Sequence, residues 1–173
     1  PVGIGALWLA AGIKIRPVFH GGSQQLESRP GTEPVPLVVG MAAAIELAVA
    51  ELGASVNLMR DRRDQLERVL CQQHPKLVVI GQNAARLPST TLLAFVGTDR
   101  QTMLMALDLA GIACSSGAAC SSGSSPPSHV LQAMTAPQSW IDSALRFGVS
   151  KFSTIDEIKL ASERISSTYS RLR

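Results

Sequence analysis

The second half of the chain alternates between strand-like and helix-like segments, and this order limits the fold more than any other feature. Short apolar or alternating runs predict four strands, at residues 77–80, 91–96, 112–113 and 143–149. Apolar residues three or four positions apart predict a helix over 100–110 and a last helix with the stripe Ile158, Ala161, Ile165, Tyr169 and Leu172. From about residue 75 onward the order predicts one compact α/β domain.

Two of the predicted helices have recognisable first residues. Ser128 follows Pro126-Pro127 and is predicted to be the N-cap of a short helix. Thr154 and Glu157 have the spacing of a capping box, which predicts the start of the last helix.

A long amphipathic helix is predicted before this domain. Apolar residues from Met41 to Leu70 keep a spacing of three or four, interrupted only by Arg63, and Gly53 is predicted to mark a bend. Basic residues between Arg60 and Arg68 alternate with acidic ones, which is typical of a solvated helix face with ion pairs one turn apart. This pattern and a net charge of only +3 argue against DNA or RNA as a partner.

Residues 1–36 do not make a fold of their own. Residues 4–10 are predicted to form a buried strand and residues 13–19 an edge strand, and an irregular loop follows. Two short strands are too few for an independent core. The predicted organisation is therefore a remnant edge of a larger domain at 1–36, a connecting helix at 37–74, and a small domain at 75–173.

The cysteine count gives an expectation about the compartment. Three cysteines without C-x-x-C spacing predict neither a disulfide framework nor a zinc site, so a reducing compartment, the cytoplasm, fits best. No apolar run approaches the ~18 residues of a membrane span, and no membrane association is expected.

The segment from Cys114 to His129 carries two cysteines in a run of serine, glycine and alanine. Such a run costs conformational entropy to order and buries little surface in return. It is either a linker with incidental thiols or a loop that presents a thiol to something outside itself.

This segment resembles the active-site loop of the long-loop cysteine desulfurases, which belong to the class V aminotransferase family. The matching residues are Ser115-Ser116-Gly117, Ala119-Cys120-Ser121 and Ser128-His129-Val130-Leu131. Other segments resemble the family in the same order, and they are Gly3-x-Gly5-Ala6-Leu7, His20-Gly21-Gly22, Arg29-Pro30-Gly31-Thr32-Glu33 and Leu145-Arg146-Phe147. The resemblance covers nearly all 173 residues.

The resemblance implies a homodimeric enzyme of the aspartate-aminotransferase-like fold (fold type I) that uses pyridoxal 5'-phosphate. Its members convert L-cysteine to L-alanine and pass the sulfur to an acceptor protein for iron–sulfur cluster or thio-cofactor assembly. In the family the Schiff-base lysine lies shortly before the first matching segment, and this chain opens on Pro1 without it. We therefore expect the C-terminal portion of such an enzyme, an α+β small domain plus an edge of the large domain, inactive alone and without stably bound cofactor.

The resemblance assigns roles to three residues. Cys120 corresponds to the nucleophile that receives sulfur as a persulfide, and its loop setting suits an accessible, mobile thiolate. Arg146 corresponds to the arginine that binds the substrate carboxylate, for which a guanidinium fork is well shaped. Thr32 corresponds to the threonine that reaches the cofactor phosphate of the partner subunit. Cys114, at a strand end, is expected to be a small buried filler.

Two other functions stay open. A relative that acts on selenocysteine, or an aminotransferase, is possible by resemblance, although an aminotransferase needs no loop thiol. A non-catalytic sulfur-accepting or scaffold domain would use Cys120 alone.

Overall fold

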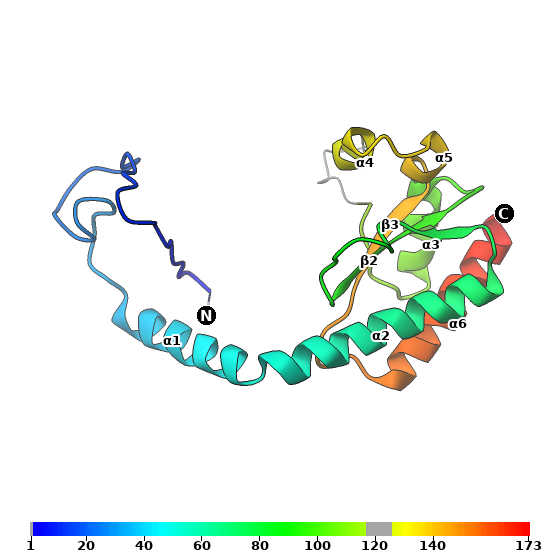
Figure 1. Ribbon diagram of the computed structural model, residues 1–173, viewed down its shortest axis with the longest axis horizontal. Helices are drawn as coiled ribbons and strands as arrows, with labels where there is room; N and C mark the ends of the chain where they lie inside the picture. Colours follow the sequence, from blue (N-terminus) through cyan, green and yellow to red (C-terminus); the bar gives the residue numbers. More distant parts are fainter. Residues whose placement is uncertain (1, 117–125) are drawn as a thin grey trace. The chain divides into compact units, whose positions relative to one another are not determined.

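The computed structural model describes residues 2–116 and 126–173. The chain divides into two units, Pro1–Leu52 and Gly53–Arg173, and each is described by itself. The second unit contains the sheet and the packed core (Figure 1). The predicted α/β class is confirmed by this mixture of strands and helices.

The sheet of the second unit has three antiparallel strands in the order β1-β2-β3. They are β1 (Leu77–Val79), β2 (Thr90–Phe95) and β3 (Ala144–Gly148). The central strand pairs Leu93 with Val79 on one side and with Leu145 on the other. The strands predicted at 77–80, 91–96 and 143–149 are therefore confirmed within one or two residues.

Three helices cover one face of this sheet and form the main core. They are α2 (Leu52–Gln73), α3 (Arg100–Leu109) and α6 (Ile155–Leu172) (Figure 1). The buried residues of this core are Leu66, Leu70, Leu77, Val79, Leu93, Phe95, Met103, Leu107, Leu145, Phe147, Ile158, Ile165 and Tyr169. The inward positions of α6 follow the predicted stripe.

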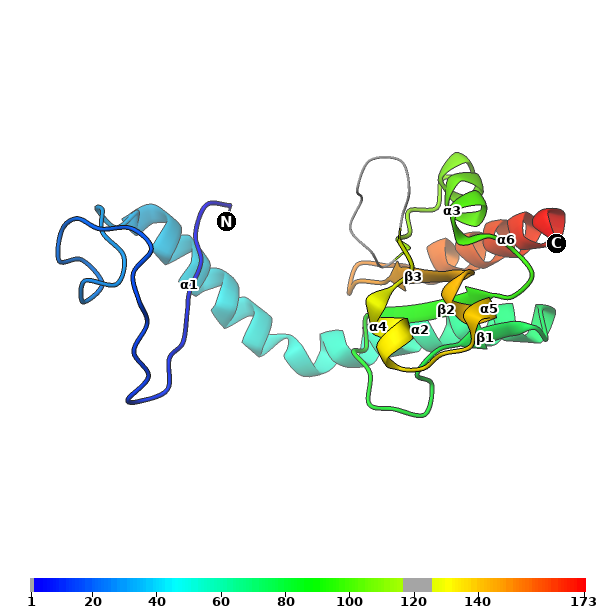
Figure 2. The same ribbon diagram turned by 90° about the horizontal axis from the view of Figure 1, so that it is seen from above.

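Two short helices, α4 (His129–Ala133) and α5 (Gln138–Ile141), lie on the other face of the sheet (Figure 2). They bury Leu131 and Ile141 against a smaller cluster that includes Ala94 and Ala144. Sequence patterns did not predict α5. Because successive strand residues point to opposite faces, neighbours in β3 contribute to different clusters.

The predicted helix caps are confirmed. The Ser128 hydroxyl accepts a hydrogen bond from the Leu131 N–H at 3.4 Å. Thr154 and Glu157 form a full capping box, in which the Glu157 N–H donates to the Thr154 hydroxyl at 3.2 Å. These caps satisfy N–H groups that have no partner inside a helix.

The predicted long helix is two helices, α1 (Val35–Ala50) and α2, interrupted at Glu51. The break comes two residues before Gly53, where the sequence predicted a bend. Among the described residues, no single helix is both long and apolar enough to cross a bilayer, and α1 and α2 meet these two conditions only when taken together across this break.

The expectation of a solvated basic face on α2 is wrong for Arg63, which is only 7% exposed. Its guanidinium donates to the Leu87 carbonyl at 2.9 Å and to the Asp64 carboxylate at 2.7 Å. The arginine can be buried because its stem lies on the apolar stripe while each of its three guanidinium nitrogens donates to an oxygen.

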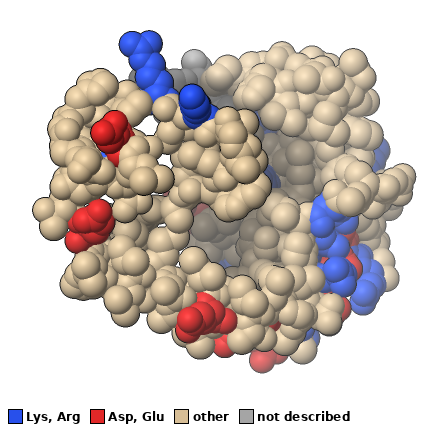
Figure 3. Space-filling model, turned by 60° about the vertical axis from the view of Figure 1, so that its left-hand side comes forward, with Lys and Arg blue, Asp and Glu red and all other residues tan. Residues whose placement is uncertain are grey.

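The strands predicted at residues 4–10 and 13–19 are wrong, since neither segment is a strand in the structure. A strand needs a neighbour for its backbone groups, and no described segment pairs with either one. The described part of Pro1–Leu52 contains no buried residue, and large apolar side chains such as Trp8 and Phe19 are more than 70% exposed. In Figure 3 most of the visible surface is uncharged, with single charged side chains at the left and a group of Lys or Arg side chains with acidic ones at the right edge.

Candidate functional site

Arg146 lies in the middle of β3, with its side chain on the face of the sheet opposite the main core. Its neighbours Leu145 and Phe147 are buried in that core, whereas Arg146 itself is exposed. On the central strand β2, the residue paired with Arg146 is Leu92. Arg146 forms no ion pair with any described carboxylate, so its guanidinium remains available to an anionic ligand.

The segment that leads into the cysteine loop is hydrogen-bonded to the backbone of Arg146. The Ser115 N–H donates to the Arg146 carbonyl at 3.0 Å, and the Arg146 N–H donates to the Ser115 carbonyl at 2.7 Å. The strand predicted at residues 112–113 is therefore wrong: the structure has one isolated antiparallel bridge, at Ser115. A single reciprocal pair holds the register without forming a longer ladder.

Cys120, the predicted nucleophile, lies outside the residues that the structure describes. The described residues on either side of its loop are both held. Ser115 pairs with Arg146 as above, and Ser128 caps α4. The pairing of Ser115 with Arg146 was not predicted, because a serine beside a serine- and glycine-rich run has no pattern of its own.

Cys114 and Cys71 are half-buried thiols that pack against the main core. Burial, with a smaller effect of Asp108, raises the pKa of Cys114 to about 11. Burial and then the charge of Glu67 also raise the pKa of Cys71. A thiolate is the reactive form of cysteine, so both environments suppress reactivity. This agrees with the expected role of Cys114 as a filler.

Thr32 is exposed and belongs to Pro1–Leu52. It follows Gly31, which has a φ of 102°. Because no described side chain of this unit is buried, its residues make no walled site for a phosphate or a pyridine ring. Lys14 and Lys76 are exposed as well. The described residues therefore do not by themselves fit pyridoxal phosphate.

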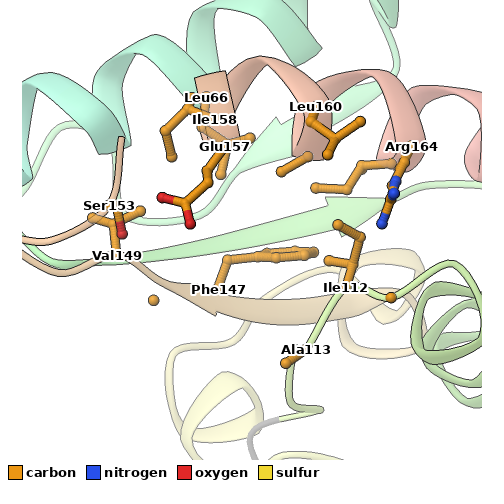
Figure 4. A pocket seen from close by; sticks show the side chains of 14 residues that line it. Leu66, Ile112, Ala113, Phe147, Val149, Ser153, Glu157, Ile158, Leu160 and Arg164 are labelled. Atoms are coloured by element: carbon orange, nitrogen blue, oxygen red, sulfur yellow. The ribbon is translucent and has the colours of Figure 1, made fainter. Parts of the chain in front are cut away.

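A cavity of about 290 Å³ opens at the edge of the main core, between α6, the end of β3 and residues 111–113 (Figure 4). Its walls include Leu66, Ile112, Phe147 and Ile158. Arg146, next to Phe147 in the chain, faces the opposite side of the sheet, so the cavity is separate from the predicted carboxylate site.

Two charged side chains at this cavity already have partners. The Glu157 carboxylate accepts from the Thr154 N–H at 2.7 Å, and this bond lowers the pKa of Glu157. Arg164 donates to the Ala110 carbonyl at 2.9 Å. No cluster of metal-ligating side chains occurs in residues 2–116 and 126–173.

Comparison with known proteins gives consistent matches over the whole chain. The family model for class-V aminotransferases matches residues 1–160. The cysteine desulfurase of Cereibacter sphaeroides is 42% identical over 173 residues, and that of Sinorhizobium fredii is 38% identical over the same length. The whole chain is covered in both matches, but only 44% and 45% of the two relatives. The chain thus spans less than half the length of these relatives.

Solved structures agree with the sequence relatives. A NifS-like protein matches with a TM-score of 0.80 at 30% identity, over 95% of this chain and 42% of its own. The NifS-like protein of Rickettsia africae matches with a TM-score of 0.76 at 30% identity, over 91% of this chain and 41% of its own. The predicted fold type I relationship and the resemblance to cysteine desulfurases are confirmed, and the chain belongs to the class-V aminotransferase family.

Proposed function

We propose that this chain is the part of a cysteine desulfurase that binds the substrate carboxylate and carries the sulfur-accepting thiol. The intact protein would convert L-cysteine to L-alanine and hold the sulfur as a persulfide on Cys120. The observation that supports this most is the reciprocal backbone pair between Ser115 and Arg146, because it ties the base of the cysteine loop to the strand with the exposed arginine.

Arg146 is suited to binding the α-carboxylate of an amino acid. Its side chain is exposed on a rigid strand, and no described acidic residue competes for it. A planar guanidinium donates two parallel hydrogen bonds to a carboxylate, a geometry that lysine does not reproduce.

Covalent geometry limits how far Cys120 can lie from Arg146. Cys120 comes five positions after Ser115, and a chain spans at most about 3.3–3.6 Å per residue, or roughly 18 Å in total. Since Ser115 is hydrogen-bonded to the backbone of Arg146, this short tether supports a thiol that can approach an amino acid held there. Cys114 is a poorer nucleophile, because a pKa of about 11 leaves it almost entirely protonated near neutral pH.

Family membership supports the remaining parts of the proposal, which concern the intact protein. It would be a homodimer that uses pyridoxal phosphate, with Thr32 of one subunit near the phosphate in the other. A sulfur-accepting protein would take up the persulfide sulfur. Three cysteines without a disulfide pattern favour the cytoplasm.

A chimera tests this proposal. Residues 1–173 would replace the matching 44% of the Cereibacter sphaeroides relative, which supplies the remaining part of a desulfurase. We expect the chimera to release sulfide from L-cysteine in the presence of a thiol reductant. Absorbance of the bound cofactor serves as an independent check that the chimera has folded.

Three variants of the chimera assign the residues. Cys120→Ala should abolish sulfide release, while Cys114→Ala should retain most of it. Arg146→Lys should raise KM about tenfold or more, because a charge-assisted hydrogen bond contributes about 1.5–3 kcal/mol. A cofactor-loaded chimera that is inactive, or one that depends on Cys114 and not on Cys120, would contradict the proposal. Sulfur transfer to Cys120 of the isolated chain from an added persulfide, with no activity in the loaded chimera, would favour the scaffold-domain alternative.

A further inference from the structure

His74 is a buried histidine that the proposed reaction does not use. It lies between the end of α2 and the start of β1 and is 7% exposed. Its backbone is fixed on both sides, because its N–H donates to the Leu70 carbonyl and its carbonyl accepts from the Leu77 N–H, each at 2.9 Å.

The imidazole of His74 contacts two residues of α6. Its Nε2 lies 2.7 Å from the Ser166 hydroxyl. Its ring packs edge-on against Tyr169, with 4.9 Å between ring centroids. Tyr169 in turn donates to the Val96 carbonyl at 2.7 Å and packs against Phe95. One ring thus joins the α2–β1 connection to the C-terminal half of α6, and through Tyr169 to the end of β2.

The surroundings of this ring oppose a positive charge. Burial lowers the pKa of His74, and the positive charge of Arg173 at the end of α6 lowers it further. The Tyr169 ring also faces His74 from α6, and burial raises the pKa of its hydroxyl, which donates to Val96. Lys76, two residues along the chain, is exposed, and no described carboxylate forms an ion pair with His74.

We propose that His74 forms a pH-sensitive contact between the α2–β1 connection and α6. The neutral ring stabilises the last turns of α6, and protonation of the ring destabilises them. The folded state favours the neutral form, so its contribution to stability is complete above the ordinary histidine pKa near 6.5. This contribution declines as the pH falls below that value, until the folded protein is itself protonated. Acidification therefore brings a positive charge, paired with no described carboxylate, into contact with Tyr169 and near Arg173.

Amide hydrogen exchange of the 173-residue chain tests this pH-sensitive contact, with rates corrected for the intrinsic effect of pH. Between pH 7.5 and pH 5.0, we expect peptides that cover residues 165–172 to lose protection severalfold more than peptides that cover β2. The His74→Gln variant keeps a hydrogen-bonding side chain but does not titrate, so its exchange should change much less over this range. His129→Gln removes an exposed histidine and should behave as the unmodified chain.

A second measurement does not depend on the Gln variant folding well. In the unmodified chain, NMR titration of the His74 ring should give a midpoint below the ordinary value, and Arg173→Gln should move it upward. The proposal is overturned if α6 keeps its protection at pH 5.0, if His74→Gln loses protection as the unmodified chain does, or if the His74 midpoint lies at its ordinary value and ignores Arg173.

Discussion

Glu67 on α2 connects the helix to the loop before β2, and its replacement is the sharpest test of the packing described above. Its carboxylate receives two hydrogen bonds from Arg86, at 2.7 and 3.1 Å, and lies 3.9 Å from the guanidinium of Arg63. The Glu67 and Arg86 side chains are only 12% and 18% exposed. In keeping with this contact, the hydrogen bond to Glu67 raises the pKa of Arg86.

The Glu67→Gln variant keeps the size of the side chain but removes its charge and one of its two acceptors. Breaking a fully buried ion pair costs about 3–5 kcal/mol, whereas an exposed pair contributes about 0–1 kcal/mol. Because this pair is mostly but not fully buried, we expect the free energy of unfolding to fall by about 2 kcal/mol. Part of that loss comes from Arg86 remaining behind without its partner.

Urea unfolding of Glu67→Gln, Arg86→Met and the double variant measures the coupling between the two side chains. We expect a coupling energy of about 1–2 kcal/mol, since residues in direct contact are not additive. Lys159→Met is a matched control, because the Lys159–Asp156 pair is 62% and 93% exposed and should contribute almost nothing. The reasoning fails if Glu67→Gln unfolds at the same urea concentration as Lys159→Met, or if the coupling energy is zero.

Three further outcomes follow from the same contacts. Thr154→Ala removes the capping-box hydroxyl of α6 and should lower the free energy of unfolding by about 1 kcal/mol in urea. A urea midpoint equal to that of Lys159→Met would show that this cap contributes nothing. Tyr169→Phe leaves the Val96 carbonyl without its donor and should cost about 1–2 kcal/mol; an unchanged urea midpoint would exclude an energetic role for that bond. In a Cys71→Ser, Cys120→Ser background, alkylation of Cys114 should be slow at pH 8 and accelerate with each pH unit toward about 11; a rate that levels off near pH 9 would show that burial does not control this thiol.

Sequence patterns predicted the second unit well where local rules and packing agree. The alternation in residues 143–149 became β3, with Leu145 and Phe147 buried and Arg146 exposed. The capping box at Thr154 and the stripe of α6 also appear as predicted. In these segments the element and its buried face follow from the same residues, so a pattern read along the chain is sufficient.

The errors in the second unit concern contacts that come from distant segments. Arg63 occupies an inward position of the α2 stripe, and its burial depends on the Leu87 carbonyl, 24 residues away. The single bridge at Ser115 likewise depends on Arg146, 31 positions further along the chain. Neither partner can be identified from the residue that needs it. For this reason Arg63 was expected in solvent, and a strand was expected at residues 112–113 where the structure has only the bridge at Ser115.

In the first unit, the predicted helix forms and the predicted strands do not. Residues 35–50 form a helix although none of them is buried, because the hydrogen bonds of a helix close within the segment itself. Residues 4–10 and 13–19 have compositions that favour strands, yet they form none, because a strand's hydrogen bonds must be made with another segment. The same scarcity of neighbours therefore removes the predicted strands and leaves the helix intact. It also explains why Val35, Val39 and Leu47 on α1 remain more than 60% exposed, although a helix that is apolar on all sides is normally covered.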